Sequence, residues 1–391
     1  MTVAPGEPTI RVGLVVDRDS AILSASGQWR VVDPSGGAIA IMDAGETVIV
    51  RAGDGGRDLS LTRSGAAAPI VAQGNVVIVP ERPGDFVGVG SRRYRGDLLV
   101  LRGTAGITVV NRVPLESYLL SVVALELGFR NPSDKEAVKA QAVAARSYAL
   151  RGRGRREALG FDVYPTDADQ VYGGVDAEFQ EIDESVVAVS GEVLTWQGQP
   201  IQALFHSTCG FSTEASDQVF QNQQPVPYLR AVSDRYGDGD HDFYCSISPK
   251  FRWREEWDAD GLTAILARTL PAIANGRTVG RVIDIRAGRT TPTGRVAELV
   301  VTTTSGDFTV GNGRVREVLR PAPDRQLQST LFQLHVDKEN GRLTKLVVSG
   351  AGYGHGVGMC QFGAVGRARA GESYRTILAT YYNGTTLERY Y

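Results

Sequence analysis

The sequence has few of the residues that mark specialised protein classes. Its 391 residues include only three cysteines and four histidines, which excludes a disulfide-dense scaffold but allows one disulfide or one metal site. No run of about 18 apolar residues occurs, so we expect no transmembrane helix. The first residues lack a basic region followed by an apolar core, so we expect no signal peptide in the chain as given, and export stays open.

The sequence also has no large excess of positive or negative charge. The formal net charge is −2 at pH 7, which gives no reason to expect nucleic acid or an anionic membrane as the main partner. A neutral or mildly polar substrate fits this balance better.

Short segments rich in Val and Ile, separated by Gly, Pro and Asp, run from Ile10 to about Val110. This pattern is typical of β-strands, and the 46 glycines favour sheets, turns and binding loops. We therefore predict an α+β fold that is rich in β-structure and has a few helices. The expected division is a β-rich portion, 1–105, followed by a core, 106–391, with a helical insert at about 250–280.

One acid interrupts an otherwise apolar stretch that follows the predicted strands. Between Glu116 and Arg130, Glu126 is the only charged residue. Apolar residues recur around it at helical spacing, so on a helix Glu126 lies on or beside the buried face. A carboxylate there must be paired, metal-bound or kept protonated by desolvation, and the protonated state is what a general acid needs. Glu126 is therefore the leading catalytic candidate.

Two helices are predicted in this region. Pro114 suits the first turn of the first helix and Gly128 suits its end. The second helix runs to about Leu150, with Ser133 as its N-cap in a capping box. On this helix, Lys139 and Arg146 are seven residues apart, which places them on one face and about 10.5 Å from each other. They could hold acidic or hydroxylated substrate groups, or they could form an ordinary exposed charged face.

Two cysteines each follow a histidine closely. His206 precedes Cys209 and His241 precedes Cys245. These spacings suit a tetrahedral Cys2His2 zinc site, which would be structural because four protein ligands leave no open position. A Cys209–Cys245 disulfide is the main rival if the protein works outside the cytoplasm, and free thiols are the third reading.

Alternating glycines from Gly350 to Gly358 precede a second cluster of polar residues. No register gives G-x-G-x-x-G and no GK[ST] follows, so a nucleotide-binding loop is excluded. The spacing instead indicates a backbone that approaches a ligand or another segment closely and ends at a helix N-terminus.

Four stretches together carry a family resemblance: EAVKAQAVAARSYA after Glu126, QVYGG from Gln170, FHSTCGFST, and GHGVGMCQFGA. They resemble the motifs of the SpoIID/LytB family, which comprises stage II sporulation protein D and its relatives. The match is good from Asn111 to Thr386. The sequence departs from the pattern at Leu127-Gly128, where Met and Pro are usual, and at Phe211, where a second glycine is usual.

The resemblance implies a peptidoglycan lytic transglycosylase of the MurNAc-GlcNAc bond, with Glu126 as general acid and base and with no cofactor needed for catalysis. It implies helices packed around a central glycan-binding cleft, and an extracytoplasmic protein whose partners are glycan strands and a cell-wall amidase. Its motifs add cleft residues to the two cations already named, which gives this substrate-binding set: Lys139, Arg146, Gln170, Tyr172, Ser207, His355 and Gln361.

Other interpretations stay open. Relatives in the family are described as amidase enhancers, so a non-catalytic peptidoglycan-binding enhancer is the main alternative, and a secreted structural wall protein is another. A conventional hydrolase would need a second carboxylate such as Glu116, Asp134 or Glu136. Tyr172 could be a core aromatic and His355 a satisfied buried histidine.

Overall fold

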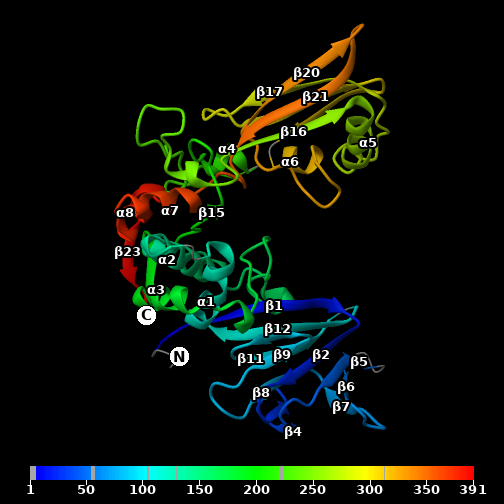
Figure 1. Ribbon diagram of the computed structural model, residues 1–391. Helices are drawn as coiled ribbons and strands as arrows, with labels where there is room; N and C mark the ends of the chain where they lie inside the picture. The colour runs from blue at the N-terminus through cyan, green and yellow to red at the C-terminus, as the bar shows by residue number, and fades with distance from the viewer. Residues whose placement is uncertain (1–5, 54–57, 104, 129–130, 221–222, 312) are drawn as a thin grey trace. The chain divides into compact units, whose positions relative to one another are not determined.

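The computed structural model describes residues 6–53, 58–103, 105–128, 131–220, 223–311 and 313–391. The chain forms two compact units (Figure 1). Unit 1 comprises Met1–Gln202 together with Thr386–Tyr391, and unit 2 comprises Ala203–Thr385.

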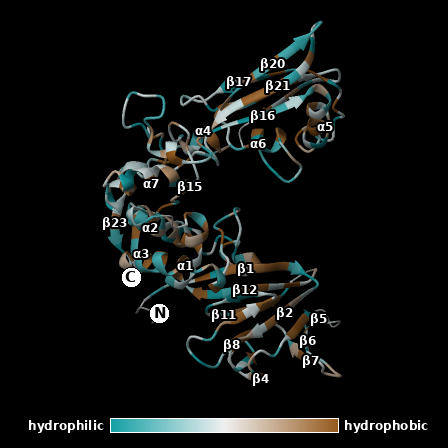
Figure 2. Ribbon diagram, in the orientation of Figure 1, coloured by the Kyte–Doolittle hydropathy of each residue, from teal (hydrophilic) through white to brown (hydrophobic). Residues whose placement is uncertain are grey.

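Unit 1 begins with two six-stranded antiparallel sheets, in the orders β1-β12-β11-β8-β3-β4 and β10-β9-β2-β5-β6-β7. Buried residues alternate with more exposed ones along several of these strands, such as β6 and β11, and hydrophobic segments run through both sheets in Figure 2. Trp29 is fully buried. The strands are β1 (Thr9–Arg18), β2 (Ser20–Ala25), β3 (Trp29–Val32), β4 (Ala38–Met42), β5 (Val48–Ala52), β6 (Asp58–Arg63), β7 (Ile70–Gln73), β8 (Val76–Pro80), β9 (Val87–Val89), β10 (Arg92–Tyr94), β11 (Asp97–Arg102) and β12 (Ile107–Pro114).

The division of the chain differs from the boundary expected at residue 105. Strand β12 lies beyond that point, yet it pairs with both β1 and β11. Residues on the two sides of 105 therefore share one sheet, and hydrogen bonding across the boundary keeps them in a single unit.

Helices complete unit 1: α1 (Leu115–Glu126), α2 (Lys135–Gly152) and α3 (Gln180–Ala188), with short 3-10 turns η1 (Pro132–Asp134), η2 (Glu157–Leu159) and η3 (Val175–Ala177). A small sheet, β14-β13-β23, is made of β13 (Glu192–Trp196), β14 (Gln199–Pro200) and β23 (Thr386–Arg389). Helix α2 contacts α1, α3 and this sheet. Its six buried alanines have little bulk, which lets these neighbours approach closely.

The start of α2 differs from the prediction. Ser133 does not cap the helix, because it lies inside η1, where its backbone N–H donates to the Asn131 side chain. Pro132 suits the first position of such a turn because its missing N–H would have no partner there. Asn131 therefore caps η1, and the N-cap residue of α2 itself is Asp134, one residue after the predicted Ser133.

Unit 2 contains two three-stranded sheets, β16-β21-β20 and β17-β18-β19, and a two-stranded parallel pair, β15-β22. The three-stranded sheets and their helices share one apolar core, which includes Trp257, Leu299 and Leu346. The elements are β15 (Phe205–His206), α4 (Ser216–Val219), η4 (Tyr244–Ile247), β16 (Arg252–Asp258), α5 (Ala259–Thr269), β17 (Val282–Thr290), β18 (Val296–Thr303), β19 (Gly306–Gly311), α6 (Val315–Val318), β20 (Phe332–Glu339), β21 (Arg342–Ala351), β22 (Met359–Cys360), α7 (Gln361–Arg369) and α8 (Tyr374–Tyr381).

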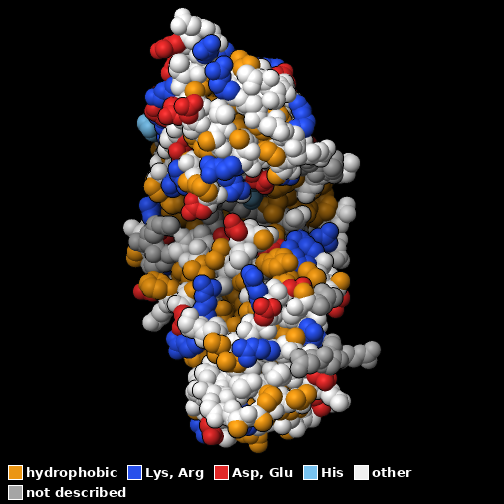
Figure 3. Space-filling view, turned by 90° about the vertical axis from the view of Figure 1, so that its right-hand side faces the viewer, with side chains coloured by type: hydrophobic (Ala, Val, Ile, Leu, Met, Phe, Trp, Pro, Cys, Tyr) orange, Lys and Arg blue, Asp and Glu red, His pale blue; other side chains and the backbone are white. Residues whose placement is uncertain are grey.

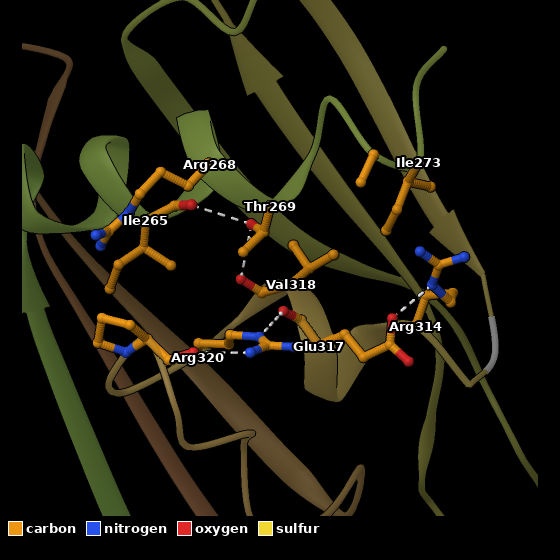
Figure 4. A pocket seen from close by; sticks show the side chains of 10 residues that line it. Ile265, Arg268, Thr269, Ile273, Arg314, Glu317, Val318 and Arg320 are labelled. Atoms are coloured by element: carbon orange, nitrogen blue, oxygen red, sulfur yellow. Dashed lines mark hydrogen bonds and ion pairs between the residues drawn. The ribbon is translucent and has the colours of Figure 1, made fainter. Parts of the chain in front are cut away.

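The predicted α+β class is confirmed. In the described chain, no helix combines the length and the apolar character that a membrane span requires. A cavity of about 400 Å³ lies beside α5 and α6 (Figure 4). Its polar groups bond locally, as when Thr269 donates to the Val318 carbonyl, and no predicted site residue lines it.

Candidate functional site

Glu126 is the last residue of α1 and is partly exposed. Its Oε1 accepts a hydrogen bond from the Val171 backbone N–H at 2.8 Å. The helix ends here because Gly128 adopts φ +71° and its N–H turns back toward the Val123 carbonyl, a conformation that glycine adopts without strain. The predicted helix end is confirmed, and the end of the helix fixes the acid in place.

The segment that supplies the Val171 N–H is fastened along α1. Tyr118 donates its hydroxyl proton to Gln170 Oε1 at 3.1 Å, and the Gly173 N–H donates to Ser121 Oγ at 2.9 Å. Tyr118 and Ser121 are three residues apart and so lie on one face of the helix. These contacts on either side of Val171 hold its N–H in register with Glu126.

Gln170 and Tyr172 are buried, with exposed fractions of 0% and 2%. Gln170 also donates to the Ala145 carbonyl on α2 at 3.3 Å. Tyr172 donates to Asn111 Oδ1 at 2.9 Å and packs against Tyr118 with ring centroids 5.0 Å apart. Burial raises the pKa of the Tyr172 hydroxyl, so it stays protonated. Both residues position the Glu126 segment in this conformation and do not offer a surface to a ligand.

Arg146 is fully buried as well. Its Nε and Nη2 each lie 2.7 Å from a carboxylate oxygen of Glu116, and Nη1 donates to the Glu192 carbonyl at 3.0 Å. The prediction that Arg146 contacts substrate therefore does not fit this geometry, because its helical face is covered by α1 and β13. Lys139 is partly exposed and pairs with Glu136 at 2.6 Å.

The alternative second carboxylates are engaged elsewhere. Glu116 is held by Arg146, Asp134 is buried, and Glu136 pairs with Lys139. That Glu126 is the catalytic acid stays a prediction.

The remaining predicted substrate-binding residues, Ser207, His355 and Gln361, lie in unit 2. Ser207 is partly exposed, and its Oγ is 3.3 Å from Thr208 Oγ1. Gln361 begins α7 and is 6% exposed, and within the described chain its Nε2 has no hydrogen-bond partner. That these residues share one glycan-binding cleft with Glu126 stays a prediction.

One residue, Val357, orients two histidines through its backbone N–H and its carbonyl. The Val357 N–H donates to His355 Nδ1 at 3.0 Å, and the Val357 carbonyl lies 3.1 Å from His206 Nδ1. His206 therefore carries its proton on Nδ1 and neutral His355 carries its proton on Nε2. Burial, reinforced by the positive charges of Arg316 and Arg295, lowers the pKa of His355 to about 4. Burial also lowers the pKa of His206, so both rings are neutral at pH 7.

The glycines of 350–358 bring the segment that contains Val357 close to its neighbours. Gly354 adopts φ +108°, and a Cβ there would lie 2.9 Å from His206 Cβ. Gly358 adopts φ +72°, and a Cβ there would overlap the Leu204 carbonyl. The predicted close approach is therefore confirmed, with the strand containing His206 as the neighbouring segment and α7 as the helix that follows.

Among the described residues, neither histidine of the predicted Cys2His2 set belongs to the group of close ligand atoms. His206 Nδ1 bonds the Val357 carbonyl, and His241 is exposed and packs on Phe251. Cys209 and Cys245 do meet, with their sulfur atoms 3.5 Å apart. Their neighbours are Asp234 and Cys360, and the ligand atoms of these four buried residues all lie within 4.8 Å of one another.

Sequence reasoning missed the partners in this cluster and the role of Ser121. Cys360 is buried, and its separation of 151 residues from Cys209 hid their contact. Asp234 lies in an irregular segment with no periodicity to mark it. Ser121 carried no motif that could have identified it.

The face drawn in Figure 3 shows no large area of one charge sign among the described residues. On the face drawn in Figure 3, basic and acidic side chains are interspersed with apolar ones. This agrees with the small net charge of −2.

Comparisons with known proteins match separate parts of the chain. Residues 103–196 match the family model described as stage II sporulation protein. Residues 237–358 match a model described as a domain of unknown function, DUF8618.

Relatives extend over most of the chain. An uncharacterized protein of Brachyspira hyodysenteriae is 30% identical over 298 residues, 76% of this chain and 73% of that protein. Stage II sporulation protein D of Bacillus subtilis is 29% identical over 296 residues, 71% of this chain and 75% of that protein. The amidase enhancer of Bacillus subtilis is 30% identical over 279 residues, and the match covers 65% of this chain but only 38% of that protein.

Proposed function

This chain belongs to the stage II sporulation protein D (SpoIID/LytB) family, and from that premise we propose that it is a peptidoglycan lytic transglycosylase that acts outside the cytoplasm. It cleaves the MurNAc-GlcNAc bond of glycan strands and leaves a 1,6-anhydro-MurNAc end. The observation that carries the proposal is the placement of Glu126, a partly exposed acid at a fixed helix end with one oxygen held by the Val171 N–H.

The proposed reaction needs only one carboxyl group. Glu126 first donates a proton to the glycosidic oxygen as the bond from C1 breaks, and GlcNAc leaves as an alcohol. The C6 hydroxyl of the same MurNAc then attacks C1 and passes its proton to the Glu126 carboxylate. Intramolecular attack replaces an activated water, since well-oriented internal nucleophiles reach effective concentrations on the order of 10⁵ M or more. This accounts for an active site without a second carboxylate.

The surrounding residues divide into two roles. Tyr118, Ser121 and Gln170 keep the Val171 N–H beside Glu126, so they are positioning residues. Lys139, Ser207, His355 and Gln361 are the proposed contacts to sugar and lactyl groups. Arg146 and Tyr172 act through the packing of α1 and α2.

The test is the product analysis of peptide-stripped glycan strands by mass spectrometry. We expect Glu126→Gln to lower the rate of anhydro-product release by at least about 10²-fold, because an amide cannot transfer the proton. Glu184→Gln is the matched control, since Glu184 is an exposed residue of α3, and it should retain the wild-type rate. Full anhydro-product release by Glu126→Gln would contradict the proposal, and new reducing ends without anhydro groups would indicate a hydrolase instead.

The second candidate is a peptidoglycan-binding enhancer of a cell-wall amidase, which the name of the Bacillus subtilis relative favours. An enhancer would bind glycan strands without producing new ends and would raise the rate of an added N-acetylmuramoyl-L-alanine amidase. Glu126→Gln would leave that stimulation unchanged. Measuring amidase rate and anhydro ends in the same reaction distinguishes the two candidates.

A further inference from the structure

We propose that unit 2 binds one Zn²⁺ ion through a buried site made by Cys209, Asp234, Cys245 and Cys360. The four residues come from four separate segments: the loop after β15, an irregular segment, η4, and the residue that caps α7. All four are fully buried. This site uses neither histidine of the Cys2His2 set that the sequence suggested, and it goes beyond the proposed glycan chemistry.

The spacing of the donor atoms fits tetrahedral zinc. Zinc–sulfur bonds of about 2.3 Å at the tetrahedral angle place two sulfur atoms about 3.8 Å apart. Cys209 Sγ and Cys245 Sγ are 3.5 Å apart, and every ligand atom of the set lies within 4.8 Å of the others. Only small movements of the side chains are needed to enclose an ion.

Cys360 is set up to carry negative charge. Its Sγ accepts backbone N–H groups from Cys209 at 3.1 Å and from Gly363 at 3.2 Å. The second of these belongs to the first turn of α7, where the helix dipole also favours an anion. Such contacts are what a metal-bound thiolate needs from its surroundings, and a neutral buried thiol does not require them.

Asp234 is oriented in the same way. Its Oδ1 accepts the Tyr381 hydroxyl at 2.7 Å and lies 3.4 Å from Arg367 Nε, and its Oδ2 accepts the Cys245 N–H at 3.1 Å. Arg367 and the amides of α7 offset part of the net negative charge that three thiolates and one carboxylate leave around Zn²⁺. With four protein ligands the ion has no open position and acts as a structural cross-link.

The zinc cross-link would stabilise a region that has little regular secondary structure. Between β15 and β16 the described chain forms only the short elements α4 and η4 and a few isolated bridges. A segment with so little regular structure gains stability from a metal that binds only the folded state. A Cys209–Cys245 disulfide would join two of these segments, whereas a zinc ion would join all four.

The experiment uses the full chain, unfolded and refolded under reducing conditions with Zn²⁺ or Co²⁺. We expect about one zinc per chain by elemental analysis, thiolate-to-cobalt charge-transfer absorption, and zinc release in proportion to thiols blocked by a mercurial reagent. Cys245→Ser and Cys360→Ser should each lower zinc content at least about tenfold. His241→Ala is the matched control and should retain zinc.

The wild-type measurements keep the test decisive if the serine variants fold poorly. Absence of zinc after refolding, with three titratable thiols, would overturn the proposal, and so would one titratable thiol in the native protein, which indicates the disulfide. Loss of zinc in His241→Ala would restore the histidine site instead. Glu126→Gln should bind zinc like wild type, so the outcome is independent of the glycan reaction.

Discussion

Arg146 and Glu116 form an ion pair in which neither side chain is exposed by more than 3%. Burial alone raises the pKa of Glu116, but the hydrogen bonds and charge of Arg146 outweigh this and hold the pKa below its ordinary value. Removing one partner leaves a buried charge unpaired, which costs about 3 to 5 kcal/mol. We predict this loss in the free energy of unfolding for Arg146→Met, measured by urea denaturation.

The control for this prediction is a double variant. Arg146→Met combined with Glu116→Leu removes both charges, so it should recover much of the lost stability, because apolar replacement of a whole buried pair is often nearly neutral. If Arg146→Met alone leaves the urea midpoint unchanged, the pair does not hold α1 against α2.

His355 predicts a dependence of stability on pH. Its pKa in the folded protein is about 4, against an ordinary value of 6.5, because burial and then Arg316 and Arg295 oppose its protonation, with neutral His206 beside it. The unfolded chain therefore binds more protons than the folded protein below pH 6.5. The contribution of His355 to the free energy of unfolding is complete above pH 6.5 and is lost as the pH falls toward 4. The loss is at most about 1.4 kcal/mol per pH unit. The free energy of unfolding is measured at several pH values. We expect it to fall less steeply with decreasing pH in His355→Gln than in the wild type. Equal slopes would contradict the assignment.

At the scale of elements, local patterns predicted what depends on local contacts. The apolar spacing around Glu126 and the glycine at 128 predicted α1 and its end, and the alternating glycines from 350 predicted a close backbone approach. Spacing on α2 placed Arg146 on a face of the helix but could not tell what covers that face. Most residues of α2 are buried, and Arg146 bonds to Glu192, which lies 46 residues away. A polar residue that was predicted to contact substrate therefore lies in the core.

The cysteine cluster shows the same limit more strongly. Pairs within four residues suggested histidine ligands, since sequence spacing reports only neighbours along the chain. The contacts that decide the cluster join residues 11 to 151 positions apart. A fold is needed to bring Cys360 to Cys209, and no periodicity in either segment records that contact.

At the scale of the whole molecule, the last residues of the chain belong to the unit formed by the first ones. Strand β23 pairs with β13 from Glu192↔Arg389 to Thr195↔Thr386. The Tyr391 hydroxyl also donates a hydrogen bond to Glu116 Oε1. These residues directly follow unit 2 along the chain. Their hydrogen bonds are made with residues of unit 1, so they stabilise unit 1.

Deleting 386–391 should therefore destabilise unit 1 selectively. The deletion removes four cross-strand residue pairs, so we expect increased hydrogen exchange at the backbone amides of β13 and the α1 end near Glu116, with the core around Leu299 unchanged. Tyr391→Phe is the milder control: it removes only the hydroxyl and should cost about 1 kcal/mol. Protection that falls in the sheets of unit 2 instead would mean that β23 stabilises the unit it follows, and the pairing with β13 would not be its main role.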